Sequence, residues 1–323
     1  MATTYAPYIC TLDDAALAKA KKELNEVPKE REGQIAKLRE LILKKPGITC
    51  RTDAKFLIRF LRRSKFSVIA AQKMIENFVI VRASEKHGIP KWFHGVSPYS
   101  EDMMEIMDTL YTTPLPGRDK NGEKILLIRT GAWDPKRPEM FENLFRYGLM
   151  VTDICLRDEA TQVHGFTIIC DFEGFSASHA SYWTYTIVKN AMNCWQDTYP
   201  NRNKGVHYYK APRIFDAVYF MMSGFMKEKL KKRIHFHKSL DELTNAVNRK
   251  SLPNEYGGVA GPLKEINQNW KLELCKNKDE LDLLKILEVN DNEISSDWSK
   301  TNVSDQDKDM SGVAGSFRKL NTD

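Results

Sequence analysis

Several features are missing from this chain of 323 residues, and each absence removes a class of protein. No stretch approaches the roughly 20 consecutive apolar residues that a membrane-spanning helix needs. The six cysteines are scattered, without a Cys-x-x-Cys pair or the spacing of a zinc site. The start of the sequence has neither the basic nor the apolar region of a secretory signal. We therefore expect a reduced, cytoplasmic protein whose contact with membranes is peripheral.

Motifs for catalysis and nucleotide binding are also absent. The chain has no G-x-S-x-G, H-E-x-x-H, G-x-G-x-x-G or Walker A sequence. His235 and His237 have the spacing of one strand face, but no third ligand lies nearby in the sequence, so we expect no metal. Asp171 and Glu173 follow an apolar run, where α/β proteins often place functional groups. No nucleophile or cofactor loop accompanies these carboxylates. We expect them to be structural, with no enzymatic activity and no cofactor, and keep acid–base catalysis as the alternative.

The first 95 or so residues predict a bundle of short amphipathic helices. Apolar residues recur three and four positions apart in each segment, as on the buried face of a helix. Thr11, Thr52 and Ser67 stand where three of these helices would begin, and their hydroxyls are suited to cap the first turn. We expect a small helical module here.

The remainder of the chain predicts alternating strands and helices. Asn121-Gly122 predicts a hairpin with a type I′ turn, and the runs at 166–170 and 206–209 predict buried strands. Helices are predicted between these runs, so the fold class is α/β with a mainly parallel sheet. We expect an N-terminal helical module at residues 1–95, an α/β domain at 96–275, and a C-terminal helix with a polar tail at 276–323.

One stretch combines positive charge with apolar residues. Residues 201–238 contain ten Lys and Arg against two acidic residues, a net charge of +8, whereas the rest of the chain carries −2. Within this stretch, residues 214–226 are apolar on nearly every side. Such a segment suits contact with an anionic membrane, where each nearby cation contributes on the order of 1 kcal/mol. Nucleic acid would also attract the charge, but the apolar segment has no purpose there, so we expect no nucleic-acid partner.

The apolar faces of the predicted helices allow two arrangements. The helices that start near Phe141 and Trp183, together with the 214–226 segment, can pack into a solid core or surround a cavity. Met221, Met222 and Met226 favour a cavity, because the unbranched methionine side chain adapts to irregular ligands. Periodicity alone leaves both arrangements open.

Three segments in order resemble the CRAL-TRIO family. Residues 53–62 (DAKFLIRFLR) resemble its N-terminal helical module, residues 165–175 (GFTIICDFEGF) its central strand and D-x-E-G turn, and residues 252–258 (LPNEYGG) its closing signature. The resemblance extends from about Ala15 to Trp270 and is nearest to carriers like the α-tocopherol transfer and retinaldehyde-binding proteins. The tail at 316–320 (SFRKL) is similar to that of insect-type members.

This resemblance implies an α/β sandwich that holds one hydrophobic molecule beneath a mobile gate helix, here from Pro212 to about Lys227. It implies a phosphoinositide clamp made of Arg202, Lys204, Lys229 and Arg233. It also implies a ligand pocket lined by Phe145, Gly148, Thr152, Phe166, Cys170, Trp183, Ala191, Cys194, Trp195, Tyr199, Val206, Val218, Met221 and Met222.

The cargo cannot be named from the resemblance, because the pocket departs from that of tocopherol carriers. Gly148 and Thr152 stand where those carriers have two serines that hold waters, and Trp183 and Trp195 add aromatic bulk. A tocopherol, retinoid, carotenoid, sterol or phosphoinositide tail would each fit the pattern. We expect a monomeric cytoplasmic carrier that releases its lipid at endosomal or plasma membranes containing phosphoinositides. The alternative is a phosphoinositide sensor or scaffold that transfers no lipid.

Overall fold

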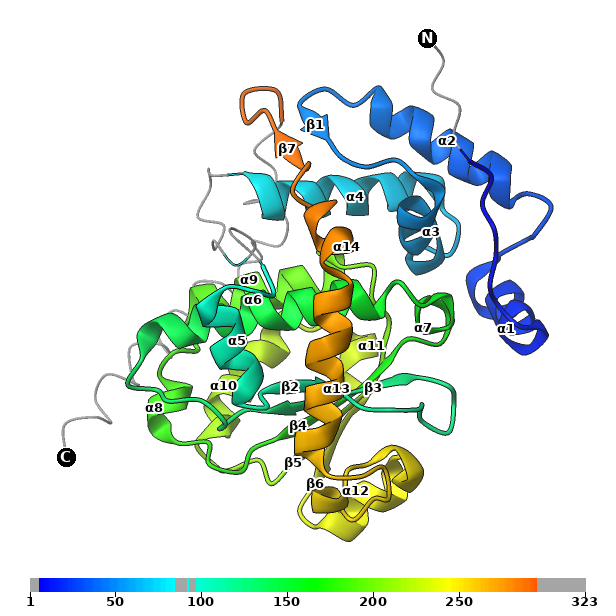
Figure 1. Ribbon diagram of the computed structural model, residues 1–323. Coiled ribbons are helices and arrows are strands. Elements are labelled where there is room, and N and C mark those ends of the chain that lie inside the picture. Colours follow the sequence, from blue (N-terminus) through cyan, green and yellow to red (C-terminus); the bar gives the residue numbers. More distant parts are fainter. Residues whose placement is uncertain (1–5, 85–91, 93–96, 295–323) are drawn as a thin grey trace.

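The computed structural model describes residues 6–84, 92 and 97–294 of the chain. A five-stranded sheet in the order β2-β3-β4-β5-β6 forms its centre, and every pairing is parallel except that of β2 with β3 (Figure 1). Apolar and β-branched residues in β4 suit its central position, which is covered on both faces. The predicted α/β class with a mainly parallel sheet is confirmed. The strands are β1 Ile48–Thr49, β2 Thr112–Pro114, β3 Lys124–Arg129, β4 Phe166–Asp171, β5 Asn203–Tyr209, β6 Ile234–His237 and β7 Glu288–Val289.

Helices cover both faces of this sheet. Leu126 and Phe166 pack on one face with residues of α6, whereas Ile125 and Ile169 pack on the other with residues of α12 and α13. Alternate residues of each strand therefore contribute to two different cores. The α-helices are α1 Asp14–Leu24, α2 Arg31–Leu43, α3 Ala54–Arg63, α4 Val68–Ala83, α5 Glu101–Asp108, α6 Pro138–Cys155, α7 Glu159–His164, α8 Ala177–Ala180, α9 Tyr185–Asn193, α10 Phe215–Phe225, α11 Glu228–Lys231, α12 Leu240–Ala246, α13 Leu263–Lys276 and α14 Lys278–Asp282. Three other helical turns are the π-helix η1 Cys194–Thr198 and the 3₁₀-helices η2 Arg249–Ser251 and η3 Asn254–Tyr256.

The helical N-terminal module is confirmed, with two corrections to its caps. Ser67 caps α4 as predicted. Asp13 caps α1 in place of the predicted Thr11, and Asp53 caps α3 in place of Thr52; each carboxylate accepts a backbone N–H of the first turn. A carboxylate is favoured because its charge also interacts well with the positive end of the helix dipole.

The predicted hairpin is present, but its predicted turn type is wrong. β2 and β3 pair antiparallel, and the Gly122 N–H donates to the Asp119 carbonyl in the loop between them. Only Gly122 in this turn has a positive φ, of 85°, whereas a type I′ turn requires positive φ at Asn121 as well. The loop between β2 and β3 is longer than two residues, so the chain reverses its direction here without a type I′ turn.

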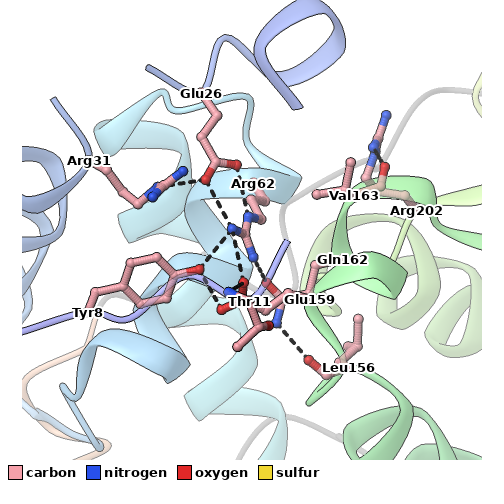
Figure 2. A network of polar contacts seen from close by, with 10 residues as sticks. All are labelled: Tyr8, Thr11, Glu26, Arg31, Arg62, Leu156, Glu159, Gln162, Val163 and Arg202. Atoms are coloured by element: carbon pink, nitrogen blue, oxygen red, sulfur yellow. Dashed lines mark hydrogen bonds and ion pairs between the residues drawn. The ribbon is translucent and has the colours of Figure 1, made fainter. Parts of the chain in front are cut away.

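A buried polar network joins the N-terminal module to the α/β domain. Arg62 of α3 lies at its centre and donates to Glu26, to Gln162 of α7 and to the Tyr8 hydroxyl (Figure 2). Tyr8 in turn donates to Glu159 of α7 at 2.5 Å. The apolar contacts are shared too, since the Phe78 and Tyr199 rings of the two parts meet edge to face. The module is therefore packed tightly on the domain.

The chain returns to the N-terminal module after α13. Here β7 pairs antiparallel with β1, so the segment beyond Lys276 lies against both parts of the molecule (Figure 1). The predicted tail at 316–320 lies outside the described residues. Among the helices that the structure describes, none is long and apolar enough to cross a membrane.

Candidate functional site

A cavity of about 190 Å³ lies between one face of the sheet and the helices α6, α9 and α10. This is far more room than the roughly 10–15 Å³ that one water occupies by the same kind of measure. Apolar and aromatic side chains make up most of its wall, as is common for sites that bind small hydrophobic molecules. Of the residues predicted to line it, those on the wall are Phe145, Gly148, Thr152, Phe166, Cys170, Trp183, Trp195, Tyr199, Val206 and Met222.

Four other residues predicted for the pocket lie beside the cavity instead of on its wall. Ala191 and Cys194 are packed in the core shared with the N-terminal module, and Val218 and Met221 are buried in the core beneath α10. All four are fully or almost fully buried. Helical spacing marks a broad apolar face, and it does not separate the part that lines a cavity from the part that packs on a neighbouring helix.

The sequence reasoning missed the β3 residues and several aromatic residues of the wall. Leu126 and Ile128 of β3 face the cavity, in register with Ile168 and Cys170 of β4. The two-residue alternation of β3 was a usable signal, because the same face of paired strands points to the same side. Further wall residues that no helical pattern indicated are Tyr111, Trp133, Phe172 and Tyr208.

The helix α10 lies within the segment predicted to be the gate and forms one side of the cavity; we call it the cover helix. Phe215, Met222 and the following Met226 contribute to the wall, while Phe220 on α10 is 54% exposed. Phe220 thus presents an apolar side chain to solvent on a helix that also lines the cavity. Opening at an apolar surface would therefore expose less hydrocarbon to water than opening in solution.

The predicted basic residues gather beside the C-terminal end of α10. Arg202 and Lys204 stand at the start of β5, and Arg233 precedes β6; the parallel pairing brings these strand starts together, with the Val206 N–H donating to the Arg233 carbonyl. The charges of Arg233 and, more weakly, of Arg202 and Lys204 lower the pKa of Lys229. We call these four residues the basic cluster. Such a concentration of cations favours an anionic partner.

A cation from the N-terminal module also lies close to the basic cluster. The charge of Lys65, in the turn after α3, contributes to the lowered pKa of Lys229. Sequence reasoning did not include Lys65, because it is far from the cluster along the chain.

Glu23 of α1 occupies part of the basic cluster. Its Oε2 atom lies 2.8 Å from a guanidinium nitrogen of Arg202 and 2.8 Å from Lys204 Nζ. Partial burial alone would raise the pKa of the Glu23 carboxyl, but the hydrogen bonds from Lys204 and Arg202 outweigh it and hold the pKa well below its usual range. The carboxylate thus stays ionised and competes with any external anion for these two cations.

The family follows from two comparisons with known proteins. The sequence model of the CRAL/TRIO domain matches residues 108–258, which include most of the cavity wall and the basic cluster. The human "Alpha-tocopherol transfer protein-like" is 32% identical over 275 residues, covering 84% of this chain and 78% of that protein. The chain belongs to the CRAL/TRIO family. Rat "Clavesin-1" is 31% identical over 253 residues, covering 78% of this CRAL/TRIO chain and 70% of its own length.

Among solved structures, that titled "Crystal structure of Sfh5" covers 80% of this CRAL/TRIO chain and 93% of its own, at 16% identity and a TM-score of 0.47. Proteins of the CRAL/TRIO family bind hydrophobic small molecules, and membership supports lipid binding and transfer as the general function. The apolar cavity is the part of the chain that can serve this function.

The two carboxylates considered for catalysis have separate partners in this CRAL/TRIO domain. Asp171 accepts from the Glu173 N–H at 3.0 Å and from the Tyr256 hydroxyl at 2.5 Å, which ties the D-x-E-G turn to the closing signature. Glu173 is exposed and forms an ion pair with Lys210. Their contacts fit the structural role that we expected for them.

The histidines of β6 meet a third histidine from β5. The Nδ1 atom of His207 lies 2.8 Å from Nε2 of His237, and the His207 ring also stacks on that of His235. Burial, together with the neighbouring His237, lowers the pKa of His207 to about 4. No group of three or more potential ligands able to hold a metal ion is found within the residues described.

Proposed function

We propose that this protein carries one small hydrophobic lipid in the cavity and transfers it to membranes that contain phosphoinositides. The observation that carries the proposal is the position of the basic cluster beside the end of α10, the helix that covers the cavity. An anionic headgroup bound at the basic cluster would lie next to the C-terminal end of α10 and could displace this helix from the cavity. A tocopherol, a retinoid or a carotenoid is the proposed cargo, and no covalent step is involved.

The protein works, in this proposal, as a cytoplasmic monomer that visits endosomal or plasma membranes reversibly. Several cations near an anionic surface, at on the order of 1 kcal/mol each, give reversible attachment rather than permanent anchoring. The name of the human relative, "Alpha-tocopherol transfer protein-like", supports a transfer function. A sensor or scaffold that transfers no lipid would have no need of an apolar cavity with a helical cover.

Replacing Lys229 and Arg233 by alanine together tests the role of the basic cluster. We expect binding to vesicles that contain phosphatidylinositol bisphosphate to weaken roughly tenfold or more, because two cations are lost at the surface. Transfer of a fluorescent tocopherol to these vesicles should slow, while retention of the ligand in solution should not change. Vesicle co-sedimentation and transfer kinetics measure the two effects.

The matched control is Lys37→Ala on α2 with Lys44→Ala directly after that helix, which removes the same charge from two exposed positions. It should leave both measurements near those of the unaltered protein. Equal transfer by the cluster variant and the control would contradict a specific role for the basic cluster.

Glu23→Gln should have the opposite effect and strengthen binding to the same vesicles. The substitution removes the carboxylate that holds Arg202 and Lys204, so both cations become available to a headgroup. Because the ion pairs are partly exposed and each is worth at most about 1 kcal/mol, we expect a gain of roughly fivefold. Glu40→Gln on α2 makes the same charge change at an exposed pair with Lys44 and serves as the control. An unchanged or weaker affinity for Glu23→Gln would show that Glu23 does not compete with the membrane.

A further inference from the structure

The C-terminal end of the cover helix α10 is fastened by one side chain of the π-helix η1. Gln196 Nε2 donates to the Phe225 carbonyl at 2.8 Å, and Gln196 Oε1 accepts from the Lys227 N–H at 2.9 Å. The last carbonyls of a helix and the first N–H groups of the next have no partner inside their own helices. The side-chain amide of Gln196, which is 8% exposed, satisfies one group of each kind. The Gln196 amide thus donates to α10 and accepts from the start of α11, as a backbone peptide group would.

An ion pair at the same place adds little to this contact. Lys227 Nζ pairs with Asp197, but the two side chains are 59% and 36% exposed. Exposed pairs of this kind contribute about 0–1 kcal/mol and weaken further with salt. The buried amide of Gln196 is therefore the main polar attachment between η1 and the segment 225–227.

The π-helix itself is held from the opposite side by the N-terminal module. Arg63 of α3 donates to the Gln196 carbonyl at 2.8 Å, and Asn77 of α4 donates to the Asp197 carbonyl at 3.2 Å. These bonds use backbone carbonyls, so they fix η1 without occupying the Gln196 side chain. π-Helical turns occur often at functional sites. Here the turn presents a glutamine, anchored on packed helices, to the C-terminal end of the cover helix.

We infer that Gln196 is the positioning residue that keeps α10 closed over the cavity. The inference rests on the proposed function, because it takes α10 to be the part that opens. The segment held by Gln196 leads directly into α11, which contains Lys229 of the basic cluster. A headgroup bound at the cluster therefore acts next to the two hydrogen bonds that must break. When they break, Phe225 and Lys227 transfer their backbone bonds to water and the end of α10 is released.

Gln196→Leu keeps the size of the side chain and removes both hydrogen bonds to the cover, together with the longer bond that Nε2 donates to the Met192 carbonyl at 3.3 Å. Two ordinary hydrogen bonds together favour the closed state by roughly tenfold or more. We expect release of a fluorescent tocopherol to vesicles of phosphatidylcholine alone to speed up roughly tenfold. Adding phosphatidylinositol bisphosphate should then accelerate release less than it does in the unaltered protein, because the step that it promotes has already occurred. Gln72→Leu on α4, where the glutamine amide donates to Glu76 at 3.1 Å, is the control.

A second pair of variants tests the same contact from the cover. Lys227 has φ −65° and Met226 has ψ 133°, both suited to a proline at position 227. Lys227→Pro removes the backbone N–H that donates a hydrogen bond to Gln196 Oε1. Lys227→Ala keeps this N–H and removes only the charge of the side chain. We expect faster release with proline than with alanine. Thermal melting without ligand checks that each variant remains folded.

The outcomes separate the inference from the function on which it rests. Faster basal release in both Gln196→Leu and Lys227→Pro, with a reduced response to phosphatidylinositol bisphosphate, supports the inference. Unchanged release in both variants, while the unaltered protein still responds to that lipid, overturns the role of Gln196 and leaves the proposed function intact. If the unaltered protein delivers no ligand to any of these vesicles, the proposed function itself fails.

Discussion

Replacing Arg62 by methionine is expected to destabilise the protein by about 3–5 kcal/mol, the usual cost of leaving a buried partner charge uncompensated. The Arg62 side chain is fully buried, and two of its nitrogens donate to the two oxygens of Glu26, which is itself 1% exposed. Methionine fills a similar volume but donates nothing. Among the residues described, Glu26 would then keep Arg31 alone as its charged partner.

The loss should extend beyond Glu26, because Arg62 bridges two parts of the molecule (Figure 2). It donates to Gln162 of α7 at 2.7 Å and to the Tyr8 hydroxyl at 2.9 Å, so the substitution also weakens the attachment of the N-terminal module. Buried polar groups that lose a partner carry the full desolvation penalty. We therefore expect a lower midpoint of urea unfolding together with faster proteolysis before α3.

Arg137→Met is the matched control for this measurement. Arg137 also bonds two carboxylates, Glu105 and Glu139, but its side chain is 44% exposed. Its loss should cost far less stability than that of Arg62, because water screens exposed ion pairs. Similar unfolding free energies for the two variants would contradict the central role given to Arg62.

The sequence predicted the layers of the fold because they depend on local patterns. The apolar run at 166–170 and the helical spacing between the strands were enough for a parallel sheet. The network around Arg62 was not predictable in this way, since Tyr8, Glu26 and Glu159 approach it from distant parts of the chain. The periodicity of the sequence does not indicate which buried arginine will pair with which glutamate.

The candidate site was predicted only in part, because some of its residues are brought together by contacts between distant segments. The resemblance placed residues of α6 and β4 at the cavity, but the contribution of β3 and the position of Ala191 and Val218 behind the wall depend on how the layers meet. The basic cluster was visible as local charge density. The carboxylate of Glu23 that occupies part of it was not, because it belongs to a helix almost 180 residues earlier.

Gly148→Leu is expected to abolish retention of the cargo without destabilising the empty protein. Gly148 lies within α6 on the cavity wall, and a Cβ atom placed there would meet nothing within 4 Å. A leucine can therefore extend into the cavity and fill the space that a lipid would use. Leucine also favours a helix interior over glycine by roughly 0.5–1 kcal/mol, so the ligand-free protein should unfold at the same or a higher temperature.

Gly148→Ala separates the effect on the helix from the effect on the cavity. Alanine adds one methyl group, which stabilises the helix but fills little of the cavity volume. The Gly148→Ala variant should therefore still retain its lipid. Mass spectrometry under native conditions measures the bound lipid, and melting of the lipid-free forms measures stability. If Gly148→Leu carried as much lipid as the unaltered protein, the cargo would have to lie elsewhere. If it lost lipid and also melted lower than the unaltered protein, the loss would reflect misfolding. Loss of lipid at unchanged or raised stability is the result that only a ligand within this cavity predicts.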